Sequence, residues 1–279
     1  MSSQDAVDDP LRKPTLTDRA KLLDRVFYAT GAMLDATDFT DEQAYHRGRL
    51  ARALAYLHGS GTVAGLKVGV EPAPEEMVVV QPGMALDRLG RIIEVPRRAC
   101  IRVDEWFTGK GPALNSLIAG GQLLADVFIQ FAACERGKTP AFASGAMDAL
   151  DAVSPSRLRD AYRLDLLPRP AGAPFPGNVW PDAFAAVNAA DRRDKMLAAV
   201  LDGWRDTTEW WDEPRKRPRP LVEHDETQET TAVFLARVTI AASAGAGGLP
   251  PVRTPGATAD NTQRPIVFTA GHWLGQAVL

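Results

Sequence analysis

The sequence contains little cysteine and almost no surplus charge of either sign. Cys100 and Cys134 are its only two cysteines among 279 residues, and neither belongs to a CxxC pair. A disulfide framework and a structural zinc site are therefore not expected, and a reducing cytoplasm is the favoured compartment. Lys and Arg number 32 against 35 Asp and Glu, a net charge of -3, which argues against a dedicated nucleic-acid binder.

Long hydrophobic runs are also missing. The first residues, MSSQDAVDDPLRKP, have neither the basic nor the apolar region of a signal peptide. The longest apolar stretch, 117–134, is interrupted by two glycines and by Gln122, Asp126 and Gln130, so no membrane span is expected. With 45 % hydrophobic and 24 % charged residues, the chain has the composition of a globular protein that can bury a sizeable core.

The first regular element predicted from the pattern is a helix. Residues 1–20 are polar and are expected to form a flexible N-terminal arm. Thr40 fits an N-cap, Gln43 completes a capping box, and Phe39 lies where a hydrophobic staple begins. Helical spacing continues to about Leu57, and Gly59 and Gly61 then end the helix. A stripe of small residues on this helix would let another element approach closely; it consists of Ala44, Gly48, Ala51 and Ala55.

Strand patterns occupy much of the remaining chain. Residues 62–104 predict a small antiparallel sheet or barrel, in which Gly90 supplies the positive φ of a hairpin turn. Residues 123–131 and 232–240 alternate as central or half-buried strands, with Arg237 on the wetter face. A helix is expected over about 182–211 and a last short strand over 265–269. The fold class is α+β, with a helix plus β-domain at 21–105 and a second β-rich region at 106–279 that carries a helical insertion at about 182–212.

A search for chemistry finds no complete catalytic or cofactor motif. The GSGTVAG run at 59–65 follows a helix and precedes a strand, whereas a dinucleotide loop needs the opposite order. Gly137-Lys138-Thr139 lacks the first glycine of a phosphate-binding loop and favours a polar turn. None of the four histidines has metal-ligand spacing. We therefore expect no catalytic residues, no cofactor and no metal.

Two clusters remain as structural or interaction candidates. Arg157 and Asp160 precede an apolar strand, which favours a buried, organising salt bridge. Trp204, Trp210 and Trp211 are interpreted first as packing residues, and next as a docking or sugar-stacking patch.

Five segments, in this order along the chain, resemble proteins encoded with phage-tail-like contractile injection systems. They are LDATDFTDEQAYHR at 34–47 followed by LHGSGTVAGLKV at 57–68, VQPGMALDRLGRIIEVP at 80–96, and SRLRDAY at 156–162 with VFLARV at 233–238. A fainter similarity extends to the shoulder domains of type VI secretion baseplate adaptors and phage receptor-binding proteins, where an acidic-Phe-x-x-Gln-x-Tyr helix leads through Gly into a β-domain.

The resemblance implies a non-enzymatic structural component at or near a baseplate, assembled in the cytoplasm. It also implies other particle proteins as partners and a homo-oligomer, for which a trimer is our expectation, with no nucleic acid and no membrane span. The residues expected to serve structure or interaction are Phe39, Gln43, Tyr45, Gly59, Gly61, Gly65, Gly90, Arg157, Asp160, Trp204, Trp210 and Trp211.

Two alternatives stay open at the level of sequence. A hydrolase acting on cell wall or glycan would need converging polar groups in a pocket. Its first candidate residues would be Asp126, Glu135, Arg157, Asp160 and His58. A carbohydrate-binding module would use the tryptophan cluster.

Overall fold

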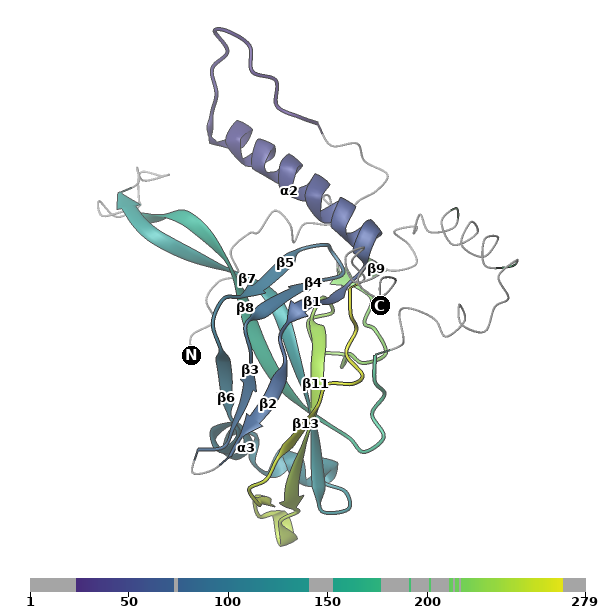
Figure 1. Cartoon of the computed structure of the whole chain (residues 1–279). Helices are drawn as coiled ribbons and strands as arrows, with labels where there is room; N and C mark the ends of the chain where they lie inside the picture. The colour runs from purple at the N-terminus through teal and green to yellow at the C-terminus, as the bar shows by residue number, and fades with distance from the viewer. Residues whose placement is uncertain are drawn as a thin grey trace.

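A computed structural model describes residues 24–72, 75–140, 153–176, 191, 201, 211–212, 214–215 and 217–267. One long helix lies above a β-rich body, and a long hairpin extends beyond that body (Figure 1). Neighbouring strands within each sheet are antiparallel. The predicted α+β class is confirmed.

Helix α2 (Ala36–His58) begins five residues earlier than the sequence predicted. Asp35 is the N-cap, and its side chain accepts from the backbone N–H groups of Thr37 and Asp38, while the Asp38 carboxylate accepts from the N–H of Asp35. The predicted cap at Thr40 is wrong, because that hydroxyl lies inside the helix and donates to the carbonyl of Ala36. The predicted C-terminus is confirmed to within one residue, since Gly59 at φ 72° ends the helix.

The sequence predicted one small antiparallel sheet or barrel within residues 62–104, whereas the structure forms two sheets of three strands there. The first sheet has the order β1-β4-β5 and the second has the order β2-β3-β6. The strands are β1 (Gly61–Gly65), β2 (Val68–Glu71), β3 (Met77–Val80), β4 (Gly83–Leu86), β5 (Ile92–Val95) and β6 (Ala99–Arg102). Gly90, at φ 79°, lies in the turn between β4 and β5 as predicted. A short helix α3 (Val103–Lys110) and a 3₁₀ segment η2 (Gly111–Leu117) follow.

A larger sheet carries the second half of the chain. Its order is β12-β11-β7-β8, and β13 also pairs with β11. Its strands are β7 (Gln122–Pro140), β8 (Val153–Arg169), β11 (Val233–Ser243), β12 (Val252–Arg253) and β13 (Thr258–Asp260). A 3₁₀ segment η3 (Ala246–Gly248) links β11 to β12, and β9 (Trp211–Asp212) pairs with β10 (Arg217–Pro218).

Strands β7 and β8 are longer than the sequence predicted. They pair from Leu124 opposite Arg169 to Pro140 opposite Val153. The polar turn expected at Gly137-Lys138-Thr139 is therefore wrong, because these residues belong to β7. Gly137 takes a φ of 66° within that strand, and the pairing register is the same on both sides of it.

One hydrophobic cluster joins the two regions of the chain. It includes side chains from the small sheets, such as Leu66 and Ile93, and from the large sheet, such as Val127 and Leu235. Strand β11 is buried along most of its length. The expected wetter face of this strand is wrong for Arg237, which is 6 % exposed because Asp126 on the neighbouring strand neutralises it.

Two predictions near the C-terminal part fall mainly outside the described residues. The helix expected over about 182–211 has only its isolated positions 191, 201 and 211 in the described set. In place of the short strand expected over 265–269, Ile266 makes an isolated parallel bridge to Thr62.

Candidate assembly surface

Helix α2 contacts the body through its small residues. Gly48 and Ala51 are the buried residues of this helix, and both belong to the predicted small-residue stripe. A Cβ atom on Gly90 would lie 1.8 Å from the carbonyl oxygen of Ala51. The β4–β5 turn therefore contacts the helix backbone directly, and only glycine at position 90 permits this approach.

The other candidate glycines have separate roles. A Cβ atom on Gly61 would lie 2.7 Å from the Pro265 carbonyl oxygen, and one on Gly65 would lie 2.2 Å from that of Pro82. Gly59 has open space around it but a φ of 72°, which suits the reversal from helix to strand. The segment 59–65 is thus a backbone junction, in agreement with the expected tight connection.

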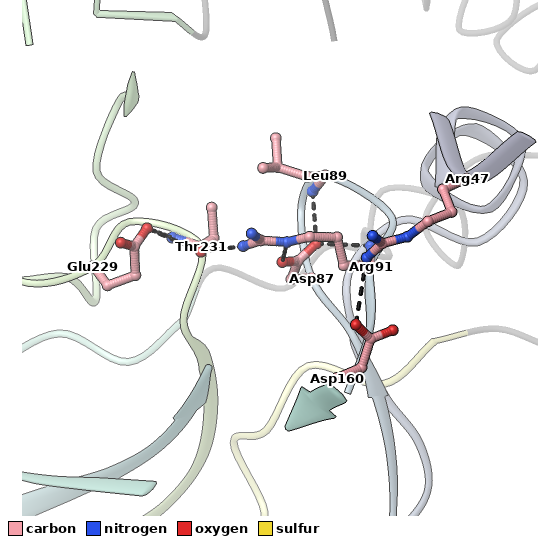
Figure 2. A network of polar contacts seen from close by, with 7 residues as sticks. All are labelled: Arg47, Asp87, Leu89, Arg91, Asp160, Glu229 and Thr231. Atoms are coloured by element: carbon pink, nitrogen blue, oxygen red, sulfur yellow. Dashed lines mark hydrogen bonds and ion pairs between the residues drawn. The ribbon is translucent and has the colours of Figure 1, made fainter. Parts of the chain in front are cut away.

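A buried polar network lies at the β4–β5 turn (Figure 2). The Asp87 carboxylate accepts from the N–H groups of Leu89 and Arg91, both at 2.9 Å, and pairs with the Arg91 guanidinium at 2.5 Å. Arg91 also donates to the Thr231 hydroxyl at 2.9 Å, and that hydroxyl donates to Glu229. Burial raises the pKa of Asp87, and the charge of Arg91 opposes this effect. The network fastens the β4–β5 turn to the segment before β11.

An ion pair links α2 to the long hairpin. Arg47 of α2 reaches Asp160 of β8 at 3.4 Å, with 63 % of the Asp160 side chain exposed (Figure 2). An organising salt bridge was expected at Arg157 and Asp160; Asp160 forms one with Arg47, but the expected burial is wrong, because both residues are exposed on β8. The sequence identified Arg157 and Asp160 as candidates, but it did not indicate that β8 continues beyond the body where they lie.

The outer end of that hairpin has two chemically different faces. We call residues 132–140 of β7 and 153–161 of β8 the hairpin arm. Cys134 is opposite Arg159 and Arg136 is opposite Arg157, so these four residues share one face. We call Arg136, Arg157 and Arg159 the arginine face; all three are exposed. The opposite face carries Asp160 together with Glu135 and Leu158.

The arginine face was not predicted, although each of its residues is visible in the sequence. Placing Arg136 directly opposite Arg157 is unfavourable, since like charges at paired positions repel each other. Within the described part of the chain, no ion pair neutralises these three arginines. An acidic surface brought against this face would remove the repulsion.

Large apolar side chains are exposed on α2 and on the segment before it. On the helix, Phe39 is 50 % exposed, Leu50 55 % and Leu57 73 %. In the preceding segment, Phe27 is 82 % and Met33 96 % exposed. Exposed apolar side chains gathered on one projecting element are typical of a surface that contacts another protein.

The remaining candidate residues are more scattered. Gln43 is exposed on α2, whereas Tyr45 is half-buried with its ring edge against His46, at a centroid distance of 5.3 Å. Trp204 and Trp210 lie outside the described residues, and only the backbone of Trp211 is described, in β9. The proposed tryptophan cluster is therefore not placed by the structure.

The residues named for a hydrolase are not brought together. Asp126 is buried between Arg237 and Arg169, at 2.7 Å and 3.1 Å. Glu135, Arg157 and Asp160 are exposed on the hairpin arm, and His58 ends α2. Among the described residues, no group of three or more His, Cys, Asp or Glu side chains is arranged to hold a metal ion.

Comparisons with known proteins found no significant match. No protein-family model matches the chain, and a search of curated proteins gave no significant match. In the part of the chain that the structure describes, no helix has both the length and the apolar character needed to cross a membrane.

Proposed function

We propose that this protein is a non-enzymatic structural component of a phage-tail-like contractile injection particle. It acts at the baseplate as an adaptor that joins neighbouring subunits or fibres. The sequence segments that resemble such proteins include the start of α2, the glycine junction and the β4–β5 hairpin. The observation that carries the proposal is the presence of two projecting elements, α2 and the hairpin arm, that expose apolar and positively charged side chains.

The chemistry of the body supports an adaptor more than an enzyme. Several of its buried charged side chains pair with one another: Asp126 binds two arginines, Asp87 binds Arg91, and Glu76 binds Arg253. Such pairs hold strands in place, and their charged groups bind each other instead of facing a substrate. Accessible polar and charged groups are also present on both projecting elements, where they can contact other proteins.

The two projecting elements offer different contacts. The apolar side chains of α2 suit a hydrophobic partner surface, and the arginine face suits an acidic one. Arginine is well adapted to this role, because its guanidinium can bind a carboxylate through two parallel hydrogen bonds. An adaptor with two such elements can hold two neighbours at once.

The test is incorporation into particles. The tagged chain is co-expressed with the proteins encoded around it, and sedimented particles are examined for the tag and by electron microscopy. We expect the chain at the baseplate end, and a several-fold lower incorporation of Arg136→Glu/Arg157→Glu/Arg159→Glu. The matched control, Arg136→Lys/Arg157→Lys/Arg159→Lys, keeps the charge and is expected to keep most of the incorporation. Normal particles assembled without this chain would overturn the proposal.

A further inference from the structure

The exposed side of α2 has a regular spacing. Six residues on it are separated alternately by four and three positions, and every one of them is exposed. They are Phe39, Gln43, His46, Leu50, Ala53 and Leu57, which we call the seam. Alternating four- and three-residue spacing is the pattern by which helices pack along one another in a coiled coil.

The seam faces away from the body. The buried residues Gly48 and Ala51, against which the β4–β5 turn packs, lie on the opposite side of the helix. Nothing in the described chain covers the seam, since Leu50 is 55 % and Leu57 73 % exposed. It extends over 19 residues, from Phe39 to Leu57, or about 27 Å of helix. Packing a second helix against the seam would remove its apolar side chains from water.

We propose that α2 binds α2 of a second copy of this chain, parallel and in register, along the seam. This inference does not depend on the proposed function, because it concerns only the chain itself. In a parallel, in-register arrangement each seam residue meets its own copy. Leu50 then packs on Leu50 and Leu57 on Leu57, while the two Gln43 amides can hydrogen-bond to each other, since each has both a donor and an acceptor.

The charges beside the seam favour the parallel orientation. Glu42 and Arg49 lie on one flank and Arg47 on the other. In a parallel pair, Glu42 of one helix faces Arg47 of the next, five positions on, which is the usual interhelical ion pair. Arg47 also binds Asp160, and its guanidinium has five donors with which to hold both carboxylates. An antiparallel pair centred on the seam would instead place Arg49 against Arg49 and Arg47 against Arg47.

The polar residues of the seam limit how the helices can pair. Gln43 and His46 occupy positions that are usually apolar in a coiled coil. Sliding one helix along the other would place these polar groups against Leu50 or Phe39. A buried polar residue at such a position lowers the stability of a coiled coil and specifies its register. The in-register arrangement avoids this mismatch.

The first test is the mass of the purified full-length chain in solution, by light scattering at tens of micromolar. We expect two or three times the mass of one chain, and a single-chain mass for Leu50→Asp/Leu57→Asp. The matched control is Leu249→Asp/Val252→Asp, because these residues are 65 % and 66 % exposed but lie on the body. A wild-type chain of single mass, or equal behaviour of the two double variants, would overturn the inference.

The second test determines orientation without relying on a disruptive change. Ala53→Cys is introduced into a Cys100→Ser/Cys134→Ser background, because both native cysteines are exposed. In the parallel, in-register pair the two Cys side chains lie opposite each other, and mild oxidation is expected to give a covalent dimer. An antiparallel pair places position 53 against position 43. Cross-linking that occurs only in a mixture with the Gln43→Cys variant would therefore overturn the proposal.

Discussion

The β-body and the two projecting elements use the same residue types in opposite ways. In the body, arginines and carboxylates are buried together: Arg237 binds both oxygens of Asp126, and its guanidinium lies 3.8 Å from the centre of the Phe175 ring. On α2 and the hairpin arm, the corresponding groups are more exposed, and the ion pair between Arg47 and Asp160 is long. Several buried charges of the body pair with one another, whereas α2 and the hairpin arm expose side chains that can contact other molecules.

The sharpest way to test this difference is to remove the acid at the centre of the body. In Asp126→Ala, Arg169 and Arg237 would remain buried without their carboxylate, because both are less than 8 % exposed. Loss of one partner from a buried pair costs about 3–5 kcal/mol of the free energy of unfolding. Chemical denaturation measures this change in the free energy of unfolding. The control is Arg163→Ala, whose pair with Asp165 is exposed and should cost less than about 1 kcal/mol.

Acid is expected to weaken the body through His224. Burial lowers the pKa of His224 to about 4, and the positive charges of Arg88 and Arg169 add to this effect, although the Ala232 carbonyl opposes it. The unfolded chain, with a histidine pKa near 6.5, binds the proton more readily. Stability due to His224 is therefore complete above pH 6.5 and is lost as the pH falls towards 4, by up to about 3 kcal/mol.

The measurement is the free energy of unfolding between pH 7 and 4, compared with His224→Gln. Glu223 acts in the opposite direction, because burial raises the pKa of its carboxyl and favours its protonated form in the folded chain. Because the wild type and His224→Gln both contain Glu223, the difference between them reports the contribution of His224 alone. A His224→Gln variant with the same dependence on pH as the wild type would contradict the assignment.

Local pattern was sufficient to predict much of the fold. Strands of the first region could be located because apolar residues alternate and glycines separate them, and the small stripe of α2 could be identified as a contact face. The start of the helix could not be predicted correctly, because Asp35 and Thr40 both have a side chain suitable for capping. Asp35 caps the helix together with Asp38, and this leaves Thr40 inside.

Features that depend on distant residues escaped prediction. Asp126 and Arg237 are 111 positions apart, so an alternating strand pattern alone placed Arg237 towards water. The hairpin arm was missed for a related reason. Its strands are polar on both faces, so they lack the apolar alternation that identifies a half-buried strand. The arginine face follows only from the register of β7 with β8.

The join between helix and body can be tested at Gly90. In Gly90→Ala the new Cβ would lie 1.8 Å from the Ala51 carbonyl, so α2 or the β4–β5 turn must move. Gly172 is a matched control, because it has the same φ of 79° with open space around it. Gly172→Ala should cost about 1–2 kcal/mol from backbone strain alone.

We expect Gly90→Ala to cost at least about 1 kcal/mol more than that control, since overpacking adds to the strain. Limited proteolysis should also cut α2 faster in this variant, because the helix is held to the body at this point. Equal stability and equal cleavage of the two glycine variants would show that the helix is held elsewhere.

The smallest expected effect concerns the ion pair between the two projecting elements. Arg47 and Asp160 lie 3.4 Å apart, with 34 % and 63 % of their side chains exposed. Water screens such a pair, so a double-mutant cycle with Arg47→Ala and Asp160→Ala should give a coupling of at most about 1 kcal/mol. The coupling should fall further in 1 M salt, where the screening length is about 3 Å. A coupling of several kcal/mol that persists in salt would mean that α2 and the hairpin arm are held as firmly as the buried pairs of the body.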